Sequence, residues 1–290
     1  MEKKIALTDI MVFTFFALVS ALCFIVFLLP IEVQELLKAR SDNWNLLTFF
    51  TSTFVHANFE HLVGNVLAFL LLGFIVYGLN RESNCEKGFI ISMFLAISLL
   101  PFIYNLSFVL LANIIIGQPL VSCGLSTVIA GIIGLIIPSL IIFLRDMLQE
   151  KRSDLYFSSS LIFLTGSAIA FPYINFGAYN LTVFITTLTV GLALLLHVAG
   201  KLLNFAKQNL NAKKKLVTAS IAILFYYTFL FSLFPSNIVM PQGNIVNIFA
   251  HYIGVFYGII SGIYTLNVLP KNKKMLKIQL PKINDHGIKN

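Results

Sequence analysis

The sequence has few charged residues and few cysteines. Lys, Arg, Asp and Glu make up 11% of the 290 residues, whereas about 25% of the residues of a soluble globular protein are charged. The three cysteines, Cys23, Cys85 and Cys123, are too few for a disulfide framework, and their positions indicate no pairing. Hydrophobic residues make up 58% of the chain. The composition therefore excludes a soluble globule and predicts a polytopic membrane protein.

Long apolar runs divide the chain into eight predicted membrane spans. A helix needs about 17–25 mainly apolar residues to cross the hydrocarbon core of a bilayer. Runs of this kind lie near residues 10–29, 59–79, 88–111, 122–144, 157–173, 180–199, 216–234 and 245–269. We therefore expect one all-α membrane domain over residues 1–270, followed by a basic tail over residues 271–290.

The positive charge follows the predicted topology. The net charge of +8 is compatible with nucleic-acid binding, but its distribution argues against that function. When the N-terminus is placed in the cytoplasm, every Lys and Arg except Lys38 and Arg40 falls in a cytoplasmic segment. This asymmetry matches the positive-inside rule. It predicts a multi-pass protein of the cell membrane with both termini in the cytoplasm and no nucleic-acid partner.

Five polar residues lie at similar predicted depths in three spans. His251 lies about six residues into the last span, where a histidine is costly and by default marks a functional site with a partner. The best partner is Ser126, about four residues into the fourth span. His56 and His61 lie at the outer start of the second span, and Asn65 is one turn deeper. At about 1.5 Å per residue, these groups are expected roughly 5–10 Å below the outer surface.

Small residues on the last span favour close helix packing. Gly254 and Gly258 follow His251 at positions i+3 and i+7 on one helix face, and small residues at such spacing let membrane helices approach closely. Close approach to the fourth span would bring the His251 imidazole within about 2.6–3.2 Å of the Ser126 hydroxyl, the range for activation of a nucleophile by a base.

Three motifs together resemble those of rhomboid intramembrane serine proteases. The matching residues are His56, His61, Leu62 and Asn65 in the second span, Gly124, Leu125 and Ser126 in the fourth, and Ala250, His251, Gly254 and Gly258 in the last. A lone Gly-x-Ser motif would be weak evidence for this family, but three motifs in the family's order and spacing are strong evidence for it. The resemblance implies a rhomboid-like bundle with a six-helix core, here with two extra spans between the serine and histidine helices.

The resemblance also implies a role for each matching residue. Ser126 would be the nucleophile and His251 the general base, in a dyad that needs neither an aspartate nor a cofactor. His61 and Asn65 would donate hydrogen bonds to the oxyanion, and His56 would support that side of the site. The expected partners are membrane lipid and transmembrane proteins that are cut near the outer membrane face, after a small residue.

The sequence departs from the family pattern at several positions. Thr127 replaces the glycine that often follows the nucleophile, and Ala130 stands where an aromatic residue commonly stacks on the catalytic imidazole. Tyr77 replaces a glutamate often found late in the second span, and Trp44 is out of register with a Trp-Arg pair of the first loop. These differences bear on rate and substrate fit more than on reaction type.

Other functions fit the sequence less well. A catalytically inactive rhomboid-like protein that binds transmembrane helices is the main alternative, favoured by Thr127 and Ala130 but not by retention of the Ser-His pair. A transporter would be expected to carry more polar residues near mid-membrane. A zinc site at His56 and His61 lacks the i,i+4 spacing of zinc proteases, and Cys123 as a nucleophile lacks the Gly-x-Ser context.

Overall fold

The computed structural model describes residues 7–117, 119–148, 151–235 and 248–268. Among these residues, eight helices are long and apolar enough to cross a membrane, which confirms the predicted all-α polytopic bundle. The predicted basic tail over residues 271–290 lies outside the described residues. The eight are formed by α1 (Leu7–Phe27), α4 (Phe59–Glu82), α5 (Glu86–Ser98) together with α6 (Leu100–Leu111), α7 (Ser126–Leu148), α8 (Lys151–Ala170), α9 (Ala178–Gln208), α10 (Leu210–Leu233) and α11 (Ile248–Val268).

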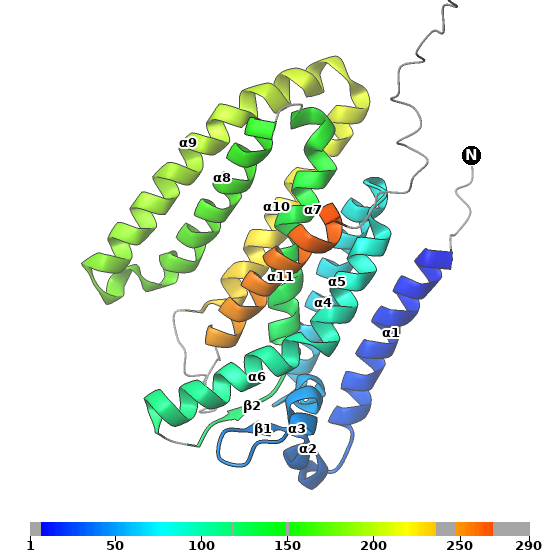
Figure 1. The fold of residues 1–290 in the computed structure, drawn as a ribbon, viewed down its shortest axis with the longest axis vertical. Coiled ribbons are helices and arrows are strands. Elements are labelled where there is room, and N and C mark those ends of the chain that lie inside the picture. The colour runs from blue at the N-terminus through cyan, green and yellow to red at the C-terminus, as the bar shows by residue number, and fades with distance from the viewer. Residues whose placement is uncertain (1–6, 118, 149–150, 236–247, 269–290) are drawn as a thin grey trace, which may run out of the picture.

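Helix α7 is the centre of the bundle. Nearly all of its residues are buried, and it contacts α4, α5, α8, α10 and α11. Helix α1 packs beside α4 at one edge, and α8 and α9 form a hairpin at the other (Figure 1). Helix α10 packs on both α4 and α7, whereas α8 and α9 pack mainly on each other. Which two spans are additional to a six-helix core stays a prediction.

A layer of short elements covers one end of the bundle, which we call the loop end. It contains α2 (Ile31–Leu37), α3 (Leu46–Thr51) and the 3-10 turn η1 (Ser52–Phe54). The strand β1 (Ala39–Arg40) pairs antiparallel with β2 (Val121–Ser122), which ties the first loop to the segment before α7. Strands this short leave no alternating pattern in the sequence from which the pairing could be predicted.

The fourth span begins later than predicted. The apolar run suggested residues 122–144, but α7 begins at Ser126 and ends at Leu148. Ser122 is still in the β1–β2 ladder, and Gly124 has a φ of 114°, which is outside the helical region. The chain can turn into a helix only after these residues. Ser126 is consequently the first residue of α7 rather than one turn inside it.

The third predicted span, residues 88–111, consists of two helices. Helix α5 ends at Ser98 and α6 begins at Leu100, and Figure 1 shows α6 lying across the loop end. Pro101 lies in the first turn of α6 and has no backbone N–H to continue the α5 hydrogen-bond ladder. The π-helical turn η2 (Ala112–Ile116) follows, and Gly117 ends it with a φ of 65°.

Two helices continue beyond their apolar runs. The predicted fifth and sixth spans were residues 157–173 and 180–199. Helix α8 starts earlier, at Lys151, and gives way at its far end to the 3-10 turn η3 (Phe171–Phe176); α9 ends later, at Gln208. An apolar run reports the thickness of the hydrocarbon core, whereas a helix can continue into the headgroup region on polar residues.

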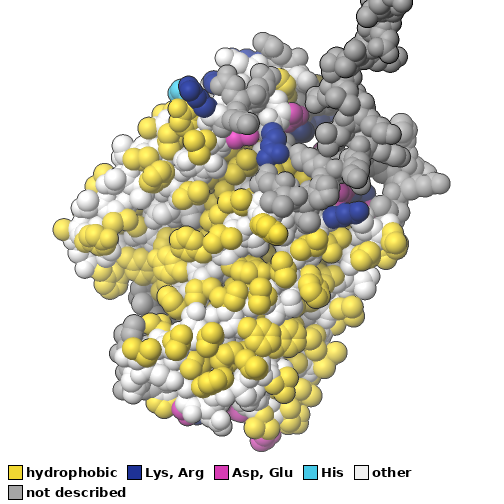
Figure 2. Space-filling model, viewed as in Figure 1, with side chains coloured by type: hydrophobic (Ala, Val, Ile, Leu, Met, Phe, Trp, Pro, Cys, Tyr) yellow, Lys and Arg dark blue, Asp and Glu magenta, His cyan; other side chains and the backbone are white. Residues whose placement is uncertain are grey.

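The end opposite the loop end is rich in basic residues. Figure 2 shows Lys and Arg side chains gathered where the N-terminus lies. This clustering is what the positive-inside rule requires of a cytoplasmic face. The cytoplasmic placement of both termini stays a prediction.

Single cysteines can test this orientation in a variant without the three native cysteines. Ala178→Cys, at the exposed α8–α9 turn, is expected to react with an impermeant thiol reagent added outside intact cells. Lys213→Cys, exposed near the start of α10, is expected to react only after the membrane is opened. The reverse pattern would place the loop end in the cytoplasm.

Candidate active site

The side chains of Ser126 and His251 form a hydrogen bond between α7 and α11. The Ser126 Oγ lies 3.0 Å from the His251 Nε2. The other ring nitrogen, Nδ1, lies 2.7 Å from the Leu233 carbonyl oxygen. Since a carbonyl can only accept, Nδ1 carries the hydrogen and donates it to Leu233. Nε2 is then left with the lone pair that accepts the Ser126 hydroxyl hydrogen, which is the tautomer required of a general base.

Phe234 supplies an aromatic ring beside the imidazole. Its ring lies edge-on to the His251 ring, with the centroids 6.0 Å apart. Ala130, at the position where the family resemblance predicted an aromatic residue, is fully buried, and a Cβ added to Gly254 would lie 2.7 Å from the Ala130 Cβ. The close packing of α7 and α11 leaves no space for a ring at residue 130. The aromatic contact comes instead from the end of α10.

Gly124 lies against the side chains of His61 and Asn65. A Cβ added to Gly124 would be 2.9 Å from the His61 Cε1 and 3.6 Å from the Asn65 Nδ2. The Asn65 Nδ2 is buried and has no hydrogen-bond partner among the described residues. The first turn of α4 is capped by Asn58, whose side chain accepts from the His61 backbone N–H at 2.8 Å. An unused amide donor therefore lies beside the backbone that leads into Ser126.

His56 packs against His61 at the loop end. The two rings are perpendicular, with centroids 5.2 Å apart, and the His56 Nδ1 lies 3.1 Å from the Phe54 carbonyl oxygen, to which it donates. Burial, and then the charge of His61, lower the pKa of His56 to about 4, so its ring is neutral at pH 7. Its Nε2 is buried without a partner among the described residues.

Asn105 on α6 is linked to the Gly124 backbone through Ser52, and this link was not predicted from the sequence. The Asn105 Nδ2 donates to the Phe49 carbonyl oxygen at 2.8 Å and to the Ser52 Oγ at 3.1 Å. The Ser52 carbonyl oxygen in turn accepts from the Gly124 N–H at 2.9 Å. The only sequence signal was a polar pair, Tyr104 and Asn105, inside the third apolar run.

Other polar residues lie away from this group. Tyr77 is near the basic end of α4, where it donates to Asp9 at 2.5 Å, and Arg81 donates to the same carboxylate at 2.7 Å. His197 packs edge-on against Tyr156 on the α8–α9 hairpin. In the described part of the chain, no group of three or more His, Cys, Asp and Glu side chains could hold a metal ion.

The family model for the Rhomboid domain matches residues 43–200, more than half of the chain. The chain belongs to the rhomboid family. The match confirms the predicted resemblance and covers His56, His61, Asn65 and Ser126 of this rhomboid, but it ends before α11. No curated protein and no solved structure matches the chain. The contribution of His251 to the site therefore rests on its hydrogen bond with Ser126.

Proposed function

We propose that this rhomboid is an intramembrane serine endopeptidase that cuts transmembrane segments near the outer membrane face. The observation that carries the proposal is the 3.0 Å contact between Ser126 and a His251 ring whose tautomer is set by the Leu233 carbonyl. A buried base poised on a serine hydroxyl is the arrangement that activates this nucleophile.

The proposed reaction proceeds in two steps on the Ser126–His251 pair. As the Ser126 Oγ attacks the carbonyl carbon of the substrate, His251 Nε2 takes the hydroxyl proton. The resulting imidazolium is stabilised by its Nδ1–H bond to the Leu233 carbonyl and then gives the proton to the leaving amine. A water molecule, deprotonated by His251 Nε2, then attacks the acyl carbon, the bond from that carbon to the Ser126 Oγ breaks, and His251 returns the proton to the Oγ as the second product leaves as a carboxylic acid.

Three donors can stabilise the negative charge on the substrate oxygen. The Asn65 amide has no other partner among the described residues, and the His61 ring lies beside it at Gly124. The backbone N–H of Ser126, at the first position of α7, is one of the N–H groups that a helix leaves unbonded. Donors that are fixed before the reaction stabilise the transition state without reorganisation.

An inactive protein that binds transmembrane helices is the second candidate. It would need neither the tautomer that Leu233 imposes on His251 nor an unpaired buried donor at Asn65. Both features favour the enzyme, because an unpaired buried polar group is costly unless it has a use.

The test is hydrolysis of single-span substrates in liposomes by the purified protein. We expect cleavage within about 10 Å of the substrate end on the loop-end side, because Ser126 and His251 lie in the first turns of their helices. Mass spectrometry of the products locates the cut. Binding of substrates without cleavage of any of them would favour the inactive alternative.

Removal of the Asn65 amide is expected to slow the chemical step. Asn65→Ala should lower kcat by about 10–10³-fold with little change in KM, since the lost hydrogen bond acts on charge that develops only in the transition state. Leu67→Ala, on the exposed face of the same helix, is the control and should keep wild-type kcat. A raised KM at unchanged kcat would instead make this face of α4 a substrate-docking surface.

A further inference from the structure

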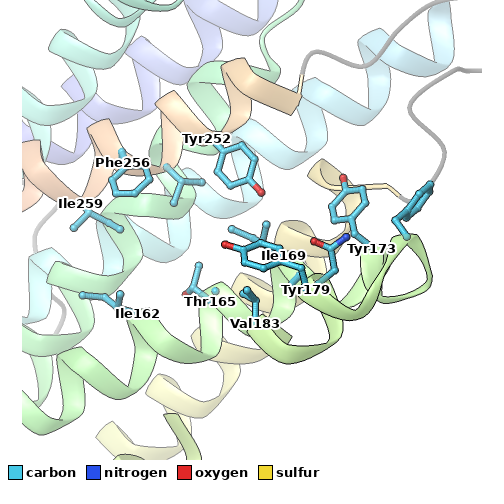
Figure 3. A pocket seen from close by; sticks show the side chains of 14 residues that line it. Ile162, Thr165, Ile169, Tyr173, Tyr179, Val183, Tyr252, Phe256 and Ile259 are labelled. Atoms are coloured by element: carbon cyan, nitrogen blue, oxygen red, sulfur yellow. The ribbon is translucent and has the colours of Figure 1, made fainter. Parts of the chain in front are cut away.

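A cavity of about 560 Å³ lies between α11 and the α8–α9 hairpin (Figure 3). It does not contain Ser126 or His251, although its wall includes Tyr252, the next residue along α11. Among its lining residues, Phe256 is 63% exposed and Tyr179 is 80% exposed. The cavity therefore opens on the outer surface of the bundle, which in a membrane is surrounded by lipid.

The cavity has one polar and one apolar end. Tyr173 lies at the end next to the α8–α9 turn and the Tyr179 ring reaches toward the middle of the cavity, whereas Ile162, Phe256 and Ile259 lie at the other end (Figure 3). None of its lining residues is charged. Tyrosine side chains are typical of the membrane–water interface, where an apolar ring meets a wet polar group. This polarity matches an amphiphile with its polar group at the tyrosines and its chain toward the bilayer centre.

The cavity is too small to enclose a transmembrane helix. On α11 its wall runs from Tyr252 to Ile259, which at 1.5 Å per residue is about 10 Å of helix. A helix with side chains is about 10–12 Å across, so a piece of this length would occupy roughly 800–1,200 Å³. The cavity volume of about 560 Å³ is roughly half to 70% of that volume. A flexible hydrocarbon chain is narrow enough to enter.

Empty space here would be unfavourable. The side chains on its wall would lack contact atoms on one side and lose dispersion energy, and water would find few polar partners at the apolar end. The bilayer itself supplies hydrocarbon chains at high concentration.

We propose that this cavity binds an acyl chain of a membrane phospholipid, with the ester and headgroup region at Tyr173, Tyr179 and Asn180. The uncharged lining accepts zwitterionic and anionic headgroups alike. The bound chain lies beside the helix that carries His251, because Tyr252, Phe256 and Ile259 of α11 line the cavity. The Phe234 ring lies near both Tyr252, at a centroid distance of 4.9 Å, and His251.

Photolabelling of the Ser126→Ala protein tests the proposal without any dependence on catalysis. The probe is phosphatidylcholine with a diazirine at the middle of one acyl chain, and adducts are mapped by mass spectrometry. We expect adducts at Phe256, Ile259 and Ile162 severalfold more often than at Leu18 and Ile25 on the exposed face of α1. Equal labelling of both regions would mean ordinary surrounding lipid and would overturn the proposal.

A filled cavity provides the matched comparison. Val183→Trp places an indole in the cavity and should reduce these adducts to the α1 level. Ile185→Trp, on the exposed face of the same helix, should leave them unchanged. Persistence of the adducts in Val183→Trp at wild-type level would overturn the proposal.

A second probe needs no cavity variant. Moving the diazirine to the glycerol end of the lipid should shift the adducts from Phe256 and Ile259 to Tyr173 and Tyr179. Adducts that do not move would contradict the proposed orientation of the lipid. Adducts that a single-span peptide removes by competition would overturn the proposal and assign the cavity to a transmembrane helix. Either result leaves the protease proposal to be decided by its own cleavage assay.

Discussion

Ser126→Ala is expected to abolish cleavage of single-span substrates in liposomes, and His251→Ala should have nearly the same effect. Without the Ser126 Oγ no acyl-enzyme can form. The His251 Nε2 is the base that lies within hydrogen-bond distance of that oxygen among the described residues, so its loss leaves no described group to take the proton. The double variant should be no worse than either single variant, because the two groups act as a unit. Initial rates of product formation, measured over background hydrolysis, check all three.

Ser261→Ala, on the same helix as His251, is the control for this series. Among the described residues its hydroxyl donates along its own helix, to the Gly258 carbonyl oxygen, so cleavage should continue at close to the wild-type rate. Turnover by Ser126→Ala well above background would remove the serine-protease proposal. Full additivity of the two losses would show that Ser126 and His251 act independently.

The pairing of Ser126 with His251 could be anticipated because a histidine is unfavourable inside an apolar span. A histidine in an apolar run needs a partner, and helix direction and rise per residue place Ser126 at a similar depth. The glycines after His251 indicate in addition that the last span can approach the fourth span closely. The depth of a residue and the glycine spacing of a helix can be worked out from the local sequence and the membrane thickness. The closeness of Ser126 and His251 is therefore predictable without the rest of the fold.

The groups that orient the dyad could not be anticipated in the same way. His251 is held by the Leu233 backbone carbonyl. Every residue type has a backbone carbonyl, so the identity of residue 233 does not indicate this contact. Phe234 is one of 28 phenylalanines and is not distinguished by position. Contacts of this kind depend on how spans pack sideways, and apolar runs in lipid do not show which face packs and which faces lipid.

The start of α7 and the break before α6 were missed for another reason. A hydropathy run has no break at Gly124 or Pro101, because a single glycine or proline changes its average little. The backbone responds strongly to both residues, through a φ of 114° at Gly124 and a missing N–H at Pro101. Turn residues inside an apolar run therefore deserve more weight than the run length.

Gly258→Ala is expected to lower the cleavage rate by about 100-fold or more, although residue 258 is two helical turns from His251. A Cβ at this position would overlap the Gly131 carbonyl oxygen and lie 2.8 Å from the Leu135 N, both on the α7 backbone. Backbone cannot move aside as a flexible side chain can, so α11 must shift away from α7. A misplacement of about 1 Å can cost 10²-fold in rate, and it would carry His251 Nε2 beyond the 3.5 Å limit of a hydrogen bond with Ser126.

Gly78→Ala separates packing from helix propensity. Gly78 is an exposed glycine inside α4, and a Cβ there would meet nothing within 4 Å. Alanine favours a helix over glycine by about 1 kcal/mol, so Gly78→Ala should keep activity and be at least as stable as the wild type. Gly258→Ala should lose about 1–3 kcal/mol of stability through overpacking. Cleavage rates and thermal unfolding of both variants in the same lipid decide the point: equal behaviour would show that the α7–α11 contact does not hold the dyad together.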